Sequence, residues 1–202
     1  MPDFWMYPKD LYDVAIDWNK KTILPVGATQ LDSVVITIFD PPPTDVTGEH
    51  LLDFGVDGLV SWGLIHNAVV EKIYTIKHRA IFNTGEVREK FMTLEVRNPR
   101  LQSLPVILKY PGEIITIPIG WDGRFPRGAT ALGSLTPKAY NDADEDVSGS
   151  YIQWGQVAGK FSVIQVKGGT GGESRLIEYG QAFDNGRKFH EYAMLIIKVP
   201  PA

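Results

Sequence analysis

The sequence predicts an all-β protein built from two tandem immunoglobulin-like β-sandwich domains related by internal duplication. Three features lead to this prediction: strand-like stretches, turn signals between them, and one long stretch that occurs twice. The stretch reads EKIYTIKHRAIFNTGEVREKFMTLEVRNP from Glu71 and ESRLIEYGQAFDNGRKFHEYAMLIIKVP from Glu173. Phe82 aligns with Phe183 and Gly85 with Gly186, so the second copy keeps the turn chemistry of the first.

Each copy of the repeated stretch has the pattern of a β-hairpin. The run from Ile73 to Phe82 is rich in Ile, Tyr, Thr and Phe, which favour a pleated, half-buried surface. After the turn, apolar and polar residues alternate with a period of two up to Val96. Gly85 closes the turn between the strands, because glycine reaches the positive φ that a bulged hairpin turn needs.

The residues before the first hairpin predict the remaining strands of one sandwich. Tyr12 to Trp18 alternates apolar and polar residues, and Leu31 to Phe39 is a β-branched run that ends at a corner of three prolines. Three shorter pieces complete the set: an edge piece at Leu24 to Thr29 and strands at Leu51 to Phe54 and Gly58 to Ile65. About seven strands and no helix are typical of an immunoglobulin-type sandwich.

The second half follows the first piece by piece, which sets the domain boundaries. Phe125 to Ser134 repeats Leu24 to Ser33, and Asp-Val-Ser-Gly from Asp146 repeats Asp-Val-Thr-Gly from Asp45. We therefore divide the chain into an N-terminal arm (1–11), a first domain (12–98), a linker (99–112) and a second domain (113–202). The prolines and apolar residues of the linker predict a stiff connection.

Composition excludes several classes of function. Residues 1–100 hold 10 Lys and Arg against 14 Asp and Glu, and the remaining residues hold 10 of each, so no basic surface for nucleic acid is expected. The absence of cysteine excludes thiolate metal sites and cysteine nucleophiles. The N-terminus lacks the pattern of a signal peptide, and no apolar run is long enough to span a membrane. We expect a soluble protein made in a cytoplasm, with no nucleic-acid or membrane partner.

Few residues suggest chemistry. Asp142, Asp144 and Asp146 have the spacing of a calcium loop but lack its closing glutamate, so they are a weak candidate for a metal site. The run from Gly168 to Gly172 precedes a strand, not a helix, and is interpreted as a loop instead of a phosphate cradle. The four histidines lack ligand spacing and are expected at the surface or at interfaces.

No motif for nucleophilic or acid–base catalysis is present, so we predict a protein that is not an enzyme and has no cofactor. Trp18 and Trp121 stand at equivalent places and are expected in the two cores. The candidates for partner binding are the other exposed-looking aromatic residues. They are Phe4, Trp5 and Tyr7 of the arm, whose aromatics either cap the first domain or dock on a neighbour, together with Trp62 and Trp154.

The chain resembles a group of small β-sandwich proteins encoded by tailed bacteriophages and prophages. Four stretches carry the resemblance: an Asp-Trp strand at Ala15–Trp18, a Ser-Val strand at Asp32–Val35, a glycine-rich loop at Lys167–Gly172 and a hairpin at Asn83–Arg88. The second half departs from this pattern at Gly120-Trp121-Asp122, where the Asp-Trp order is reversed. The group defines no catalytic residue that could be transferred to this sequence.

The resemblance implies a structural protein of the virion, assembled in the bacterial cytoplasm. The leading expectation is a capsid decoration (cement) protein that braces the head, and the alternative is a neck, collar, tail or fibre-base component. The implied partners are major capsid or neck and tail subunits, together with other copies of the chain. A module that binds carbohydrate on a host surface is the second alternative, from a different class.

Overall fold

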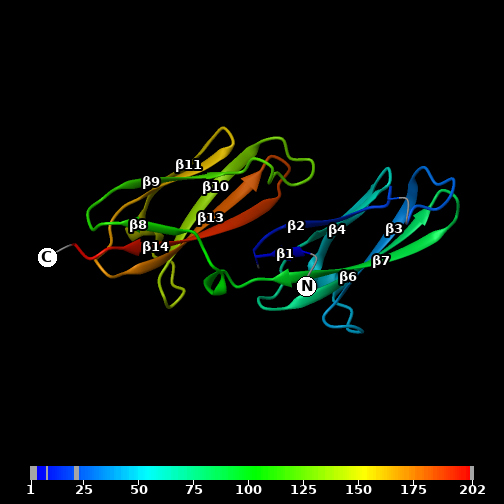
Figure 1. Ribbon diagram of the computed structural model, residues 1–202, viewed down its shortest axis with the longest axis horizontal. Helices are drawn as coiled ribbons and strands as arrows, with labels where there is room; N and C mark the ends of the chain where they lie inside the picture. Colours follow the sequence, from blue (N-terminus) through cyan, green and yellow to red (C-terminus); the bar gives the residue numbers. More distant parts are fainter. Residues whose placement is uncertain (1–3, 8, 21–22, 201–202) are drawn as a thin grey trace. The chain divides into compact units, whose positions relative to one another are not determined.

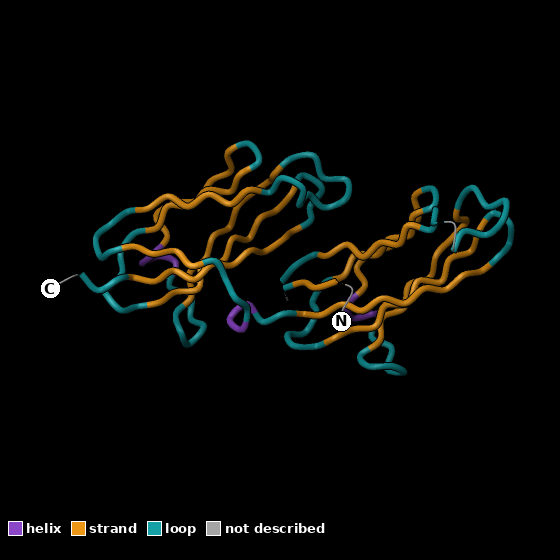
Figure 2. Tube along the Cα trace, viewed as in Figure 1, coloured by secondary structure: helices purple, strands orange, loops and turns teal. Residues whose placement is uncertain are grey.

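The computed structural model describes residues 4–7, 9–20 and 23–200, without the side chains of residues 4 and 5. The chain forms two compact units, Met1–Asn98 (unit 1) and Pro99–Ala202 (unit 2). Each unit is a sandwich of two sheets, with strands as its dominant element (Figures 1 and 2). The predicted duplication of an all-β, two-domain architecture is confirmed.

Unit 1 contains a four-stranded sheet in the order β1-β7-β6-β3 and a three-stranded sheet in the order β2-β5-β4. Its elements are β1 (Phe4–Met6), β2 (Tyr12–Asp17), β3 (Leu31–Phe39), α1 (Thr47–His50), β4 (Leu51–Asp57), β5 (Val60–Ile65), β6 (Ile73–Phe82) and β7 (Val87–Val96). The order places the second, fifth and fourth strands opposite the third, sixth and seventh. Apart from β1, which joins the sheet of β7, β6 and β3, this connectivity is that of the immunoglobulin sandwich.

Unit 2 repeats this topology with sheets β8-β14-β13-β10 and β9-β12-β11. Its elements are η1 (Pro99–Leu101), β8 (Val106–Lys109), β9 (Ile115–Gly120), β10 (Leu132–Tyr140), α2 (Ser148–Tyr151), β11 (Ile152–Ala158), β12 (Phe161–Val166), β13 (Ser174–Phe183) and β14 (Lys188–Ile197). The predicted hairpins are β6–β7 and β13–β14, and Gly85 and Gly186 adopt φ values of 80° and 81° in their turns.

The predicted arm and linker are not separate from the sandwiches, which corrects two of the predicted boundaries. In the arm, β1 pairs in parallel with β7, and Phe4 lies beside Leu94. In the linker, β8 pairs in parallel with β14, and Ile107 lies beside Leu195. The arm and the linker are therefore equivalent first strands of the two units. Each is too short to show a period in the sequence.

Two further expectations about elements are wrong. Residues 24–29 form turns and no strand, because Ala28 N–H donates to the Pro25 carbonyl and Gly27 has a φ of 81°. The prediction of no helix overlooked the short helical turns α1, α2 and η1 (Figure 2). The four residues of α1 follow β3 and lead directly into β4, so this turn reverses the chain between the two sheets.

A tryptophan anchors each core, as predicted. Trp18 and Trp121 are each 1% exposed. The indole of Trp18 meets the ring of Phe82 edge-to-face at 5.8 Å, and Trp121 meets Phe183 in the same way at 5.7 Å. Such pairs contribute about 0.5–1.5 kcal/mol beyond the burial of their area.

A buried polar link joins the two sheets of each unit. In unit 1, Trp18 Nε1 donates to Ser61 Oγ (2.8 Å), and this hydroxyl lies 2.9 Å from His78 Nδ1 on the opposite sheet. In unit 2, Trp121 donates to Ser162 Oγ (2.7 Å), whose hydroxyl donates to Gln181 Oε1 (2.5 Å). The serines are equivalent, whereas the third members stand at different positions of their strands.

The repeated Asp-Val-Thr/Ser-Gly motif also has a structural role. Asp45 accepts a hydrogen bond from Thr47 N–H (2.9 Å), and Thr47 Oγ1 accepts one from Ile38 N–H (2.8 Å). Asp146 and Ser148 make the same contacts in unit 2, at 3.0 Å and with Ala139 N–H at 2.9 Å. The motif therefore joins the helical turn to the end of the preceding strand, because its side-chain oxygens accept hydrogen bonds from backbone N–H groups of both.

We expect His78 to make the stability of unit 1 depend on pH. His78 is buried, and desolvation lowers its pKa from 6.5 to about 4. Between these values the unfolded chain binds more protons than the folded chain, so stability is full above pH 6.5 and falls as the pH drops toward 4. The full loss is roughly 3 kcal/mol.

This dependence can be measured by urea unfolding of the full chain between pH 4 and 7. His78→Gln serves as the control, since its side chain does not titrate in this range. The loss of stability should be smaller in His78→Gln by roughly the same 3 kcal/mol. Parallel profiles for the two proteins would contradict the assignment.

Candidate functional site

The aromatic residues of the arm belong to unit 1. The side chains of Phe4 and Trp5 lie outside the described residues, although their backbone is part of β1. Tyr7 is 6% exposed, and its N–H donates to Asp10 Oδ2 (2.9 Å). Of the two alternatives for the arm, capping of the first domain is therefore the one that the position of Tyr7 supports.

Trp62 lies on the outer face of the three-stranded sheet of unit 1. Ser61 and Gly63, its neighbours on β5, are buried toward the core, so the alternation of the strand directs Trp62 outward. Trp62 pairs with Ala15 on one side and with Gly55 on the other. A Cβ at residue 55 would lie 2.9 Å from Cζ2 of the indole, so glycine allows the ring to lie across β4.

Carboxylates flank this tryptophan on both neighbouring strands. On β2, Asp13 and Asp17 stand two residues before and after Ala15, which pairs with Trp62. On β4, Asp53 and Asp57 stand in the same way around Gly55, which pairs with Trp62 from the other side. The equivalent residues of unit 2 carry no charge: they are Thr116, Gly120, Trp154 and Ala158. Because the same fold forms without them in unit 2, the four carboxylates are not a requirement of the sandwich. We call this surface, together with Trp62, the Trp62 face.

Trp154 occupies a different place on its own sheet. It lies on the edge strand β11 and pairs with Gln165, whose Nε2 is 3.5 Å from Thr116 Oγ1. Trp154 and Trp62 are both half-buried. The two predicted candidates are therefore not equivalent, and the surroundings of Trp154 are neutral where those of Trp62 are acidic.

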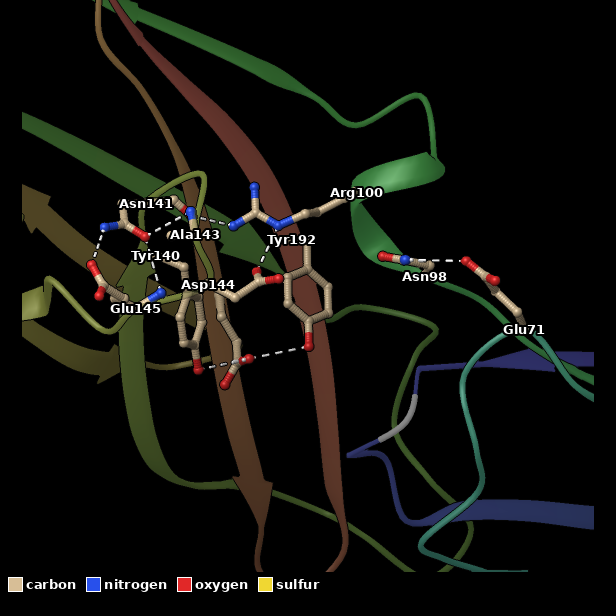
Figure 3. Close-up of polar contacts among 10 residues, drawn as sticks. Glu71, Asn98, Arg100, Tyr140, Asn141, Ala143, Asp144, Glu145 and Tyr192 are labelled. Atoms are coloured by element: carbon tan, nitrogen blue, oxygen red, sulfur yellow. Dashed lines mark hydrogen bonds and ion pairs between the residues drawn. The ribbon is translucent and has the colours of Figure 1, made fainter.

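Two of the three aspartates of the weak calcium candidate are held by other partners. Asp144 accepts from Arg100 Nε at 2.7 Å (Figure 3). Asp146 forms an ion pair with Lys138 at 3.1 Å. The hydrogen bonds from Ser148 and the nearby Lys138 lower the pKa of Asp146 to about 2. In the part of the chain that the structure describes, no three His, Cys, Asp or Glu residues form a group that could hold a metal ion.

The glycine-rich run is a loop, and a buried lysine holds its start. Lys109 on β8 is 1% exposed, and its ammonium donates to the carbonyls of Gly168 (2.6 Å) and Tyr110 (3.0 Å). Desolvation lowers the pKa of Lys109. A Cβ at Gly168 would lie 2.7 Å from the Ser150 carbonyl, which explains the need for glycine there. The equivalent position in unit 1 is Met6, so the repeat could not predict this contact.

The histidines are not all at the surface, contrary to expectation. His78 belongs to the core link, and His50 is 5% exposed, with its ring 4.9 Å from that of Tyr74. Another buried polar residue without a sequence signal is Glu178, on the outer face of the four-stranded sheet of unit 2. Its Oε2 accepts from the hydroxyls of Tyr192 (3.1 Å) and Tyr140 (3.3 Å; Figure 3).

Comparison with known proteins shows no family for this chain. No family model matches the chain, and no curated protein matches it. Among solved structures, 118 chains match, and one of them is a chimeric titin Z1Z2 functionalized with a KLER exogenous peptide from decorin. The alignment covers 98% of this chain and 95% of that one, at 8% identity and a TM-score of 0.32. At these values the similarity says nothing about partners or ligands.

The helices of the described residues are all too short and too polar to cross a membrane.

We expect Gly55→Ala to displace the indole of Trp62 from the sheet. The added Cβ would approach the ring more closely than real side chains do, so the ring must move toward solvent. Tryptophan fluorescence should therefore shift to longer wavelength. Gly48→Ala is the matched control, because a Cβ there meets nothing within 4 Å. The shift must vanish when Trp62→Phe is combined with Gly55→Ala, and its persistence would assign it to another tryptophan.

Proposed function

We propose that this protein is a non-enzymatic structural protein of a tailed-bacteriophage virion, and most specifically a decoration protein that braces the capsid. The four stretches of resemblance motivate the assignment, and a neck, collar, tail or fibre-base position is the alternative within the same class. The observation that carries the proposal is a sheet face of unit 1 on which three large apolar residues are exposed between charged and polar side chains. Interfaces with other proteins combine these kinds of residue.

This surface is on the outer face of the sheet β1-β7-β6-β3. Val35, Ile73 and Phe91 are 49%, 53% and 57% exposed, while the residues that alternate with them are buried. Lys77 stands beside Phe91, and Arg79 stands beside Val35. Both basic side chains lie 3.7 Å from Glu89, so this patch combines exposed apolar residues with ion-paired charges, as protein–protein interfaces do.

Unit 2 supplies an internal comparison for this surface. The residues equivalent to Val35, Ile73 and Phe91 are Thr136, Ser174 and Tyr192. Tyr192 is buried and donates its hydroxyl to Glu178 (Figure 3), whereas Phe91 at the same position is 57% exposed. On the same face of unit 2, Val106 and Leu108 of β8 are 57% and 51% exposed, so both units expose apolar residues there but at different positions. A weak site of this kind holds a partner firmly when many copies bind the same particle.

The first experiment is immunogold labelling of virus-like particles from the source lysate with an antibody against this protein. Regular label over the head would support a decoration protein, and label at one vertex would support a neck or tail component. Particles without label would overturn the virion assignment.

The patch itself can be tested with purified particles that lack the protein. Phe91→Asp should lower particle binding by about tenfold or more, because an exposed aromatic residue at the centre of a patch is a typical hot spot. Val26→Asp is the control, since Val26 is 99% exposed in a turn. Equal binding of the two variants would exclude the patch as the contact.

A carbohydrate-binding module is the second candidate, and the Trp62 face is the observation that favours it. An aromatic ring that lies on a sheet, with carboxylates on both sides, offers stacking and hydrogen-bond acceptors to a sugar. Saturable quenching of tryptophan fluorescence by bacterial surface glycan, abolished by Trp62→Ala but not by Trp154→Ala, would support this function. Absence of any saturable glycan effect would exclude it.

A further inference from the structure

Strand β8 forms an open edge of unit 2. It is the last strand of the sheet β8-β14-β13-β10, and it pairs in parallel with β14. Just before β8 and at its end, the carbonyls of Pro105 and Lys109 accept hydrogen bonds from the N–H groups of Met194 and Lys198. Backbone groups alternate between the two sides of a strand, so those at positions 105, 107 and 109 face β14. Those at positions 106 and 108 therefore point away from the sheet.

The two residues that present their backbone at this edge are Val106 and Leu108. They are 57% and 51% exposed, so they lie at the surface. The next N–H group on this side, that of Tyr110, donates to Glu113 Oε2 at 2.5 Å, which ends the open edge after Leu108. The edge presents no charge either, since Lys109 is only 1% exposed. An exposed and uncharged edge strand is a template for pairing with another strand.

Three other edge strands of the two units carry features that prevent such pairing. Strand β10 contains Pro137, which has no N–H group, followed by Lys138, and β9 contains Pro118. On β4, the N–H group of Phe54 donates to Asp53 Oδ1 at 2.9 Å. Proline and charged side chains are common means of protecting an edge. Strand β8 has neither between positions 106 and 108.

A second copy of the chain matches this edge in both backbone and charge. In an antiparallel pair of β8 strands centred on Ile107, Val106 of each copy stands opposite Leu108 of the other. Residues opposite each other in this way exchange both of their N–H···O=C hydrogen bonds, so every backbone group that points outward at positions 106 and 108 gains a partner. Like charges opposite each other would destabilise such a pair, and this edge has none.

Apolar side chains continue from the edge onto the outer face of the sheet. Met194 and Ile196 of β14 stand beside the two edge residues, and both are half-buried. The equivalent residues of unit 1 are Thr93 and Glu95, so the fold does not require an apolar strip here. In the antiparallel pair the strips of the two copies join across the edge. Removal of this apolar surface from water favours association.

We propose that two copies of this chain form a dimer by antiparallel pairing of β8 about a two-fold axis at Ile107. The same residues contact each other from both sides, so the assembly closes at two copies and does not propagate. The inference does not rest on the virion assignment. Loss of the dimer would leave the labelling of particles unaffected, and particles without label would leave the dimer of the purified chain unaffected.

The first test is sedimentation equilibrium of the purified full chain at micromolar concentrations, where we expect a reversible dimer. Leu108→Lys should weaken association at least tenfold, because it places a charge in the pairing edge of each copy. Leu52→Lys is the matched control, since Leu52 is 55% exposed on the edge strand β4, and it should associate like the original protein. Equal association of the two variants would overturn the proposal. A monomer at every concentration would also overturn it and leave the edge to a strand of a different protein.

The second test fixes the register with a single cysteine, because the chain has none of its own. In the dimer, the Cα atoms at position 107 of the two copies lie about 4.5 Å apart, which a disulfide can span. The two copies of position 108 are diagonal neighbours at about 7–8 Å, which is too far. Ile107→Cys should therefore cross-link faster with oxidised glutathione than Leu108→Cys, although position 108 is the more exposed.

Cross-linking of Leu108→Cys at an equal or higher rate would overturn the two-fold axis at Ile107. Thermal unfolding identifies any variant that fails to fold, and Leu108→Lys decides the question if Ile107→Cys does not fold.

Discussion

The buried link from tryptophan to serine is the contact on which both sandwiches depend. Immunoglobulin domains commonly join their two sheets with a disulfide, and this chain has no cysteine. Here the sheets are joined by Trp18, Ser61 and His78 in unit 1, and by Trp121, Ser162 and Gln181 in unit 2. Hydrogen bonds that cross an apolar core favour one alignment of the sheets, because any other alignment breaks them and leaves these buried polar groups unpaired.

This constraint explains which residues the two units share. The tryptophan, the serine and the phenylalanine that meets the indole are the same in both units, and so are the glycines of the hairpin turns. The Asp-Val-Thr/Ser-Gly motif is also shared, since it pairs the backbone at the end of a strand. All of these residues act inside one unit and would be needed by any protein with this fold.

Residues that differ between the units are not required by the shared fold, so they are the candidates for function. The exposed Phe91 has a buried counterpart in Tyr192, the carboxylates of the Trp62 face have uncharged counterparts, and Met92 has a small one in Ala193. None of these changes alters the order of the strands. Two copies of one fold therefore expose different residues on equivalent sheet faces, with the acidic aromatic face on unit 1.

The sequence by itself determined the elements whose signals are local. The hairpins, the core tryptophans and the duplication follow from alternation, turn glycines and repeated letters, which are all read within a short stretch of chain. Only the tertiary structure assigned β1 and β8 to the sheets, because each pairs with a strand more than 80 residues later and is too short to show alternation. The same holds for the burial of Tyr7 and His78 and for the contact of Lys109 with Gly168. Each depends on residues that are distant along the chain and meet only when the sheets pack.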